Sequence, residues 1–596
     1  MRIGRVLAGS FVLLLLLATS GAAQRQKKNV KPAFPSQWDA LVDDFFNEAY
    51  FKYHPTEGTA AGFHQYDPRL EDYSRSGVDT EIAALKTYKT KLERFDAKKL
   101  SQEQRDDWQL IWDYVNSRLL TLEDLRFWQK DPDRYSSNIT NSIFVIMSRK
   151  FAPEEQRMLS VIQREKKIPH VFEAAAQNLK NPPKIYTQVA LMQLPGIISF
   201  FQKDVPAAFT HVKSPRLLMQ FRASNGAVIN SLQRYEKFLK EEVLPKSNGE
   251  FRIGAENFRK KLLYDEMVDL PLDRLLEIGM ADLRKNQRWY QETAAKLDPN
   301  RTPQQILEEE GKDHPAPDKL LQTFRDTLGG LKSFIESEKI ITIPSPIPPI
   351  VQETPPFARA LTFASMDTPG PFEKKAKEAF FNVTLPEPAW KPQEVEEHMS
   401  GFNYGTIIST AVHEVYPGHY TQFLWVPQAP SKVRKLLGAN SNAEGWAHYC
   451  EQMMLDEGYG RSNEPMPGKS EIESKQFLKL RLGQLQDALL RNARFIVGLE
   501  MHTGKMTYEQ GVEFFIKEGY QSRANAERET RRGTSDPTYL YYTLGKLQIL
   551  KLREDYRKKM GSRFSLQEFH DHFMKQGFPP IKMIRRAMLG DNSPVL

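Results

Sequence analysis

The spacing of apolar residues is the feature of this sequence that most restricts its fold. Along most of the chain they recur at intervals of three and four, the pattern of an amphipathic helix. The clearest segments are 36–53, 160–180, 230–245, 272–297 and 474–502. Ser36 and Ser231 are expected N-caps, and a further helix is expected from Thr302, with Pro303 in its first position. The pattern predicts a mainly α fold.

The first 23 residues have the organisation of a secretory signal peptide. A basic start, "MRIGR", precedes the apolar run "VLAGSFVLLLLLA" and the small residues "TSGAA". The apolar run is too short and wrongly flanked for a spanning helix, and Gly21 and Ala23 suit cleavage after Ala23. We expect a mature chain of residues 24–596 that is exported, periplasmic or secreted, and has no stable membrane anchor. The alternative is an uncleaved membrane anchor.

Cys450 is the only cysteine in the 596 residues. It permits no internal disulfide and no cysteine-rich zinc site, and the lack of a cysteine after the apolar run argues against a lipid anchor. Any metal must therefore be held by His, Asp and Glu. The net charge is +8, or about +6 once Arg2 and Arg5 leave with the leader, and bases are interleaved with acids. We expect no nucleic-acid partner, and the sequence indicates no oligomeric state.

Residues 340–392 interrupt the helical pattern. The stretch "IITIPSPIPPIVQETPP" is rich in proline, and "RALTFASM" and "FFNVTLPE" are typical of short strands. We expect a small sheet just before the histidine-containing segment described next. An edge strand of this sheet could pair with an extended peptide, and the alternative is a sheet that only supports the helices.

The segment "TAVHEVYPGHYTQ" (410–422) carries two histidines six residues apart. In a regular helix His413 and His419 would point about 240° apart around the axis and could not reach one metal ion. However, Pro417 has no N–H to give to the carbonyl of His413, and Gly418 tolerates unusual backbone angles. We expect a bulge between Glu414 and His419 that brings the imidazoles together and turns Glu414 toward a metal-bound water. The alternative is a surface turn with two solvated histidines.

A second group of metal-binding residue types lies in "NAEGWAHYCEQMMLDEG". Glu444, His448 and Glu451 occupy positions i, i+4 and i+7, so they share one face of a helix. Glu444 suits a third metal ligand, which leaves a fourth position for water. His448 or Glu451 could orient a ligand histidine. The alternative is a solvated polar stripe, but large apolar residues on the opposite face indicate a buried helix.

The sequence resembles a bacterial family catalogued as a domain of unknown function within the gluzincin clan of zinc peptidases. "HEVYPGH" and "EGWAHYCE" carry the resemblance most specifically. "HPTEGTAAGFHQYDPRLEDYS" (54–74), "LRNARFIVGLEMH" and "YYTLGKLQILKLRE" are similar to further family segments, so the resemblance covers almost the whole mature chain. It implies one large helical, two-lobed zincin-like domain with a deep cleft, similar to the peptidyl-dipeptidase and dipeptidyl peptidase III types. The small sheet would lie at about 340–392 and the metal-site core at about 405–455.

The resemblance also implies roles for individual residues. His413, His419 and Glu444 would bind one Zn²⁺, Glu414 would act as the general base, and Tyr542 would face the site. The family tolerates an apolar residue at the position of His448.

The expected substrate contacts are less well defined. Arg494 and Arg532 could bind a substrate carboxylate, and their alternative is ordinary helix salt bridges or solvated charges. His502 is kept from the family pattern, and we expect it among the substrate-binding residues. Gly498 stands where the family often has aspartate, and "PTYL" at 537–540 stands where it often has "PGQA". These departures concern substrate contacts and leave the expected metal centre intact.

Two further polar groups are interpreted as structural. His64 with Asp67 and Asp72 is expected to form a buried network, although a second polar site is the alternative. "HDHF" at 570–573 is expected to be a solvated helix face.

These features together favour a zinc-dependent hydrolase that cleaves short peptides with a water activated by Glu414. Tyr542 would help to stabilise the oxyanion. The alternatives are a zinc hydrolase of another amide or ester and a metal-binding or peptide-binding protein without turnover, which would not require Glu414. An interaction scaffold without metal is a third possibility. The sequence does not indicate peptide length, side-chain preference or the end that is attacked.

Overall fold

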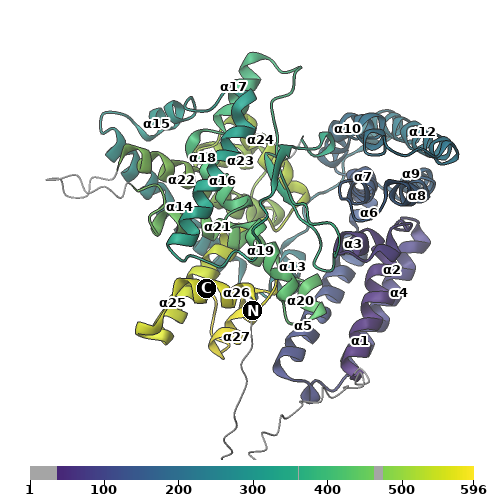
Figure 1. Cartoon of the computed structure of the whole chain (residues 1–596), viewed down its shortest axis with the longest axis horizontal. Coiled ribbons are helices and arrows are strands. Elements are labelled where there is room, and N and C mark those ends of the chain that lie inside the picture. The colour runs from purple at the N-terminus through teal and green to yellow at the C-terminus, as the bar shows by residue number, and fades with distance from the viewer. Residues whose placement is uncertain (1–35, 360–361, 462–473) are drawn as a thin grey trace, which may run out of the picture.

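The computed structural model describes residues 36–359, 362–461 and 474–596. Helices dominate this part of the chain, as the apolar spacing predicts, and a small sheet lies among them (Figure 1). The expected signal peptide, residues 1–23, lies outside the described residues. Within the described ranges, no helix has the length and apolar character needed to cross a membrane.

Helices form the first half of the described chain. They are α1 (Gln37–Phe45), α2 (Phe51–Tyr53), α3 (Pro55–Ala61), α4 (Arg75–Arg94), α5 (Gln102–Leu119), α6 (Phe127–Lys130), α7 (Asp133–Met147), α8 (Glu154–Glu165), α9 (Ile168–Asn178), α10 (Lys184–Ser199), α11 (Val205–Ala207), α12 (Pro215–Phe238), α13 (Ala255–Glu266), α14 (Leu272–Leu297), α15 (Pro303–Glu310) and α16 (Leu320–Ser337). Segments of π-helix continue α1, α5, α10 and α12.

The strands of the described chain lie between residues 350 and 383, after α16 and before α17. The strands are β1 (Ile350–Glu353), β2 (Ala364–Asp367) and β3 (Phe380–Val383). The helices that follow are α17 (Pro392–Ser400), α18 (Tyr404–Glu414), α19 (His419–Trp425), α20 (Lys432–Leu436), α21 (Asn440–Asp456), α22 (Lys475–His502), α23 (Tyr508–Lys517), α24 (Arg523–Ser535), α25 (Tyr541–Met560), α26 (Leu566–Met574) and α27 (Ile581–Leu589).

Local capping explains several of the helix starts, and one predicted cap is wrong. Ser36 and Thr302 each form a capping box at the start of α1 and α15. Ser231 lies inside α12, which is capped instead by Ser214 before a proline at the first helical position. The apolar period of α12 extends further toward the N-terminus than the predicted segment, so Ser231 is an interior residue.

The sheet has the strand order β1–β3–β2. β1 runs parallel to β3, with Ile350 beside Phe380, and β2 runs antiparallel to β3, with Ala364 beside Val383. The two strands expected from "RALTFASM" and "FFNVTLPE" are present as β2 and β3. β1 lies in the proline-rich stretch, where no strand was expected, because its pairing with β3 is a long-range contact. β2 is an edge strand, which leaves one side of its backbone without a strand partner in this sheet.

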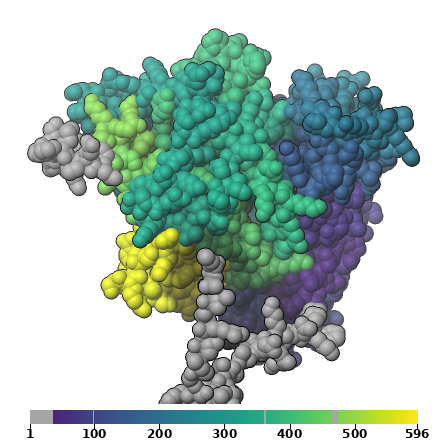
Figure 2. All heavy atoms as spheres, viewed as in Figure 1, coloured from purple at the N-terminus to yellow at the C-terminus, as the bar shows by residue number. Residues whose placement is uncertain are grey.

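Apolar side chains gather in several clusters, and one of them joins the two ends of the chain. The cluster of α1–α5 includes Val433 in α20, Leu437 directly after α20, and Met583 of α27. Figure 1 shows the purple N-terminal helices beside α20, and Figure 2 shows this N-terminal part packed against the teal and green part of the chain. The N-terminal helices therefore contact the segment that connects α19 to α21.

Helices α21 and α25 pack at a close glycine contact. A Cβ atom on Gly545 would lie 1.8 Å from the carbonyl oxygen of Ser441 and 2.7 Å from the Cα atom of Gly445. A Cβ atom on Gly445 would in turn lie 2.4 Å from the Cα atom of Gly545. No larger residue fits either position without displacing a helix. This contact fixes α21, which carries Glu444, against α25, which carries Tyr542.

Candidate functional site

The histidine motif lies where one helix stops and another starts. α18 ends at Glu414 and α19 begins at His419, and the Tyr416–Pro417 peptide bond is cis. The prediction of a bulge within one continuous helix is therefore wrong, because the chain forms two separate helices here. The underlying prediction, that these residues do not form a regular helix and that the two imidazoles approach each other, agrees with the structure.

Close backbone contacts hold this break in place. A Cβ atom on Gly418 would lie 1.8 Å from the carbonyl oxygen of His413, so only glycine fits. The N–H of Gly418 donates to the carbonyl of Val412 at 3.0 Å. The indole Nε1 of Trp446, on α21, donates to the carbonyl of Pro417 at 2.9 Å. The break is thus tied to the helix that supplies the remaining candidate ligand.

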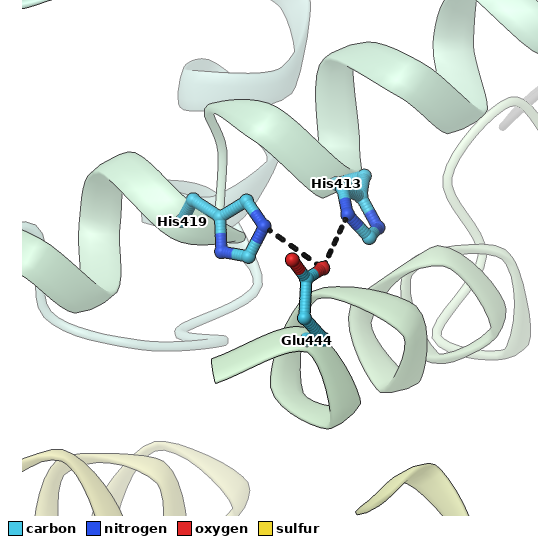
Figure 3. Close-up of side chains that lie close together, drawn as sticks. All are labelled: His413, His419 and Glu444. Carbon is cyan, nitrogen blue, oxygen red and sulfur yellow. Dashed lines mark ion pairs between the residues drawn. The ribbon is translucent and has the colours of Figure 1, made fainter. Parts of the chain in front are cut away.

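His413, His419 and Glu444 converge on one small volume. Figure 3 shows the two imidazoles, from α18 and α19, pointing at the carboxylate of α21. Oε2 of Glu444 lies 3.3 Å from Nε2 of each histidine, and one possible ligand atom from each residue lies within 4.8 Å of the others. Among the described residues this oxygen accepts no hydrogen bond of acceptable geometry, although it is buried. Three ligand atoms that face a common point, rather than bonding to one another, fit a metal ion.

The charges around this point favour a cation. Burial alone would raise the pKa of Glu444, but the neighbouring His419 and His413 hold it well below its usual range. Burial alone would lower the pKa of His413, but the neighbouring carboxylates of Glu444 and Glu451 raise it to about 9. Both shifts stabilise positive charge between the ligand atoms. A divalent cation between these ligand atoms would supply the positive charge that a proton on a histidine supplies in its absence.

A buried network orients His413. Nδ1 of His413 lies 2.7 Å from Oε1 of Glu451, and Nδ1 of His448 lies 3.0 Å from Oε2 of the same carboxylate. Burial lowers the pKa of His448 to about 3, so the ring is neutral and donates through Nδ1–H. Burial alone would raise the pKa of Glu451, but Arg491 and the two histidines hold it far below its usual range. Because Glu451 accepts from Nδ1 of His413, Nε2 of that ring is left to bind a metal.

Arg491 is the member of this network that the sequence did not indicate. Its Nη2 atom lies 2.9 Å from Oε1 of Glu451, and its Nη1 atom lies 3.6 Å from Asp487. It belongs to the segment "LRNARF", in which Arg494 is the arginine expected to contact a substrate. Nothing in the local pattern separates the two arginines, since both lie in α22 and only tertiary contacts distinguish them.

A cavity of about 970 Å³ opens beside the candidate ligands. His413, His419 and Glu444 line it together with Glu414, the last residue of α18. Glu414 is buried, and this burial raises its pKa, partly offset by His413 and His419. Other walls come from α3, from β2 with the residues before it, and from α22 and α24. The cavity is therefore assembled from segments far apart in the chain.

Tyr542 lines the same cavity among three guanidinium groups. Those of Arg491, Arg494 and Arg532 lie 5.8, 4.8 and 5.8 Å from the centre of its ring. Nη2 of Arg532 donates to the Tyr542 hydroxyl oxygen at 3.0 Å. Arg494 donates two hydrogen bonds to Glu529 at 2.6 and 2.9 Å, as its salt-bridge alternative predicts. Arg532 pairs less closely, at 3.6 Å from Asp536, and borders the cavity.

His502 is not brought to the cavity, so its expected place among the substrate contacts is corrected. It is fully buried, and its Nε2 atom lies 2.7 Å from the carbonyl oxygen of Gly533. Burial lowers its pKa to about 4, so the ring is neutral and donates this hydrogen bond. Its position at the end of α22 places it in the packing between α22 and α24, behind the cavity wall.

Two structural interpretations are also revised. His64 bonds to Asp67 at 3.1 Å and to Glu373 at 2.8 Å, whereas Asp72 accepts from the backbone N–H of Ser74 instead. The network at His64 is thus real but only half-buried and includes a partner from a distant loop.

The "HDHF" segment is not a uniformly solvated face. His570 is fully buried, with Nδ1 2.7 Å from the carbonyl oxygen of Ile340 and Nε2 2.9 Å from the hydroxyl of Tyr449. His572, two residues on, is more exposed, so the segment places one histidine inside and one outside.

The chain is similar over most of its length to known proteins. The model of the family described as "Bacterial protein of unknown function (DUF885)" matches residues 55–588. A solved structure of a candidate lipoprotein of unknown function from Shewanella oneidensis is 27% identical, with a TM-score of 0.73, and the match covers 93% of this chain and 98% of that chain. A candidate lipoprotein from Colwellia psychrerythraea has the same fold, at 18% identity, a TM-score of 0.75, and coverage of 93% and 99%. No curated protein sequence matches the chain.

Proposed function

The chain belongs to this bacterial protein family of unknown function, and from the geometry of its site we propose that it is a zinc-dependent hydrolase that cleaves short peptides. One observation carries the proposal. His413, His419 and Glu444 place their ligand atoms within 4.8 Å of one another at the wall of a large cavity, and Glu414 borders that cavity directly after the first of them. The resemblance of the two motifs to gluzincin zinc peptidases supports the same function.

The donor set suits zinc. Two imidazole nitrogens and one carboxylate are the ligands of a common class of catalytic zinc sites, which keep a further position open. When bound, the ion would supply Lewis acidity, which lowers the pKa of a coordinated water toward about 7. Glu451 would keep Nε2 of His413 available by accepting from Nδ1.

Glu414 is the proposed proton carrier. Its carboxylate would take the proton of the attacking water and then pass it to the leaving amine of the peptide. Burial raises its pKa, which brings its basicity closer to that needed for both transfers at neutral pH. Its position, one residue after His413 and at the wall of the same cavity, supports this role.

Tyr542 is the proposed donor to the substrate carbonyl. Its hydroxyl oxygen accepts a hydrogen bond from Arg532, so its own O–H remains free to donate into the cavity. A donor held in this way stabilises the negative charge that develops on the carbonyl oxygen. The three neighbouring guanidinium groups add positive potential at the same place.

The sheet favours a peptide over other amides or esters. Ala364, Ser365 and Met366 of the edge strand β2 line the cavity. The unpaired side of such a strand can hydrogen-bond to the backbone of an extended peptide, which a small amide or ester cannot reproduce. A cavity of about 970 Å³ is large enough for several peptide residues but excludes a folded chain.

We place this activity in the cell envelope or outside the cell. The two structures with the same fold are described as candidate lipoproteins, which is consistent with the secretory leader expected here. An exported peptidase of this kind would serve peptide scavenging or envelope turnover.

Metal binding by titration and peptide cleavage by mass spectrometry test the proposal. The protein should bind one zinc ion tightly, and His413→Ala should remove that binding, whereas exposed His170→Ala should not. Zinc-loaded protein should cleave short peptides and lose that activity with a chelator. If zinc binds but no peptide is cleaved, the alternative of a binding protein without turnover is favoured. Full zinc stoichiometry in His413→Ala would refute the ligand assignment.

A further inference from the structure

One wall of the cavity comes from the N-terminal helices and carries an acid. Glu57, on α3, lines the same cavity as the candidate zinc ligands, although more than 350 residues separate it from them in sequence. It belongs to the segment 54–74, whose similarity to the family has no role in the reaction proposed above. Figure 1 shows α3 at the inner end of the N-terminal helices, close to α20 and the body of the protein.

Glu57 has no hydrogen-bonded or ion-paired partner among the residues that the structure describes, and its side chain is exposed to the cavity. The charged groups around it have other partners. His54 pairs with Glu81 at 3.1 Å, and Glu71 accepts from the backbone N–H and the hydroxyl of Thr56, both at 2.9 Å.

Lys435, a cation that borders the same cavity, also has another contact. Its Nζ atom lies over the ring of Phe372, 5.7 Å from the centre, and forms no ion pair with Glu57 among the described residues. Among the described residues, Glu57 is therefore an acid without a hydrogen bond or an ion pair of its own. The protein around the cavity raises the pKa of Glu57 although its side chain is exposed to the cavity, and the nearby His54 opposes this shift.

The backbone that carries Glu57 is held firmly. Directly before Glu57, the hydroxyl of Thr56 donates to Glu71. Two residues after Glu57, the hydroxyl of Thr59 accepts from Nη2 of buried Arg164 at 2.7 Å. A Cβ atom on Gly58 would lie 2.6 Å from the ring of Tyr66, so α3 packs closely on that residue. A carboxylate presented from a fixed backbone, without a partner, is prepared to receive a ligand cation.

We propose that Glu57 selects peptides that carry a cationic nitrogen, either the free amino terminus or a basic side chain. This inference rests on the proposed function, because it assigns the substrate of the same cavity. Neutral amides and uncharged esters would gain nothing from Glu57. A peptide cation would pair with it in a protein-lined space where a charge-assisted hydrogen bond is stronger than in water.

Binding measurements on the full-length chain can isolate this effect. Glu414→Gln, which should bind but not cleave, serves as the background, with Glu57→Gln added to it. The probes are tetra-alanine with a free amino terminus, the same peptide with an acetylated amino terminus, and an acetylated tetrapeptide with one lysine. The matched control is Glu48→Gln, which removes an exposed acid elsewhere on the N-terminal helices.

Glu57→Gln should weaken binding of at least one cationic peptide about tenfold or more. Binding of the acetylated neutral peptide should change less than twofold, and Glu48→Gln should change none of the three. The free-amine and lysine probes then identify which cation is recognised. Equal effects of Glu57→Gln on all three peptides, or no effect on any, would overturn the inference.

The two proposals can fail separately. If the wild-type chain binds cationic peptides through Glu57 but cleaves none, the hydrolase proposal fails and the assignment of Glu57 stands. If it cleaves peptides without regard to their charge, the hydrolase stands and Glu57 is not a specificity residue. If none of the three peptides binds, both are contradicted.

Discussion

The carboxylate of Glu451 lies 2.7 Å from Nδ1 of His413, on the side of the ring away from the other candidate ligands. The two residues come from different helices, α21 and α18, and both are buried. A carboxylate placed behind a histidine in this way fixes the tautomer of the ring and raises the basicity of its other nitrogen. The residue that orients His413 and the third candidate ligand, Glu444, thus share one helix.

Replacing Glu451 should weaken zinc binding. In Glu451→Gln the negative charge behind His413 is lost, so zinc affinity should fall about 10-fold to 100-fold. Competition with a zinc chelator of known affinity measures this. The matched control is exposed Glu509→Gln, which should bind zinc as the wild type does. Unchanged affinity in a folded Glu451→Gln protein would show that this contact does not tune the site.

Replacing the Tyr542 hydroxyl should slow catalysis without removing the metal. Tyr542→Phe keeps the ring among its three arginines but removes the proposed donor to the carbonyl oxygen. Loss of one such donor costs about 10²-fold to 10³-fold in kcat. Steady-state kinetics should show this loss with little change in KM and with full zinc content. A loss confined to KM would assign Tyr542 to substrate binding instead.

A methyl group at the α21–α25 crossing should destabilise the site. Gly545→Ala would place a Cβ atom 1.8 Å from the carbonyl oxygen of Ser441, so the helices must separate. Its thermal midpoint and its zinc affinity should both fall. Gly226→Ala in α12 is the control, because a Cβ atom there meets nothing within 4 Å and alanine favours a helix by about 1 kcal/mol. Equal midpoints for the two variants would contradict the packing argument.

Acid should selectively remove the contribution of Glu81 to stability. Arg118 donates to both its carboxylate oxygens, at 2.6 and 3.0 Å. Burial alone would raise the pKa of Glu81, but Arg118 and His54 lower it from 4.5 to about 2, which corresponds to about 3 kcal/mol. Because the pKa is lower in the folded state, this stability is present above about pH 4.5 and is lost as the pH falls toward 2.

Urea unfolding of the wild type and Glu81→Gln at pH 7, 4 and 3 measures that contribution. The variant should be less stable at pH 7, and the difference between the two proteins should shrink at pH 4 and further at pH 3. Comparing the two at each pH cancels the effect of acid on other groups, including the metal site. A difference that does not depend on pH would contradict the ion-pair explanation.

Regular helices could be predicted from the sequence because their signals are local. The apolar period places α14 at Leu272–Leu297 and α22 at Lys475–His502, where the structure has them. The N-cap expected at Ser231 is wrong, because a residue of a cap-forming type can also lie inside a helix, as Ser231 does in α12. β1 could not be predicted, since its only signal is its pairing with β3, thirty residues away.

The site residues also divide into those that the sequence predicts and those that depend on packing between distant helices. The proline and glycine in "HEVYPGH" act locally, so the approach of His413 and His419 could be predicted from spacing. Glu444 could be predicted because a catalytic zinc site needs a third protein ligand and "EGWAHYCE" resembles the family motif. Arg491 and Glu57 could not be chosen from the sequence, since their places in the cavity depend on α22 and α3 packing against distant helices. Zinc itself stays a prediction that the experiments above address.

Peptide cleavage by zinc-loaded wild type and Glu414→Gln, measured side by side at equal zinc content, tests the central claim most directly. Glutamine keeps the size of the side chain at the end of α18 but cannot carry the proton. We predict that both proteins hold one zinc ion and that Glu414→Gln loses at least 100-fold in kcat, within the range that general-base catalysis contributes. Equal cleavage by the two proteins at equal zinc content would contradict the proposed mechanism.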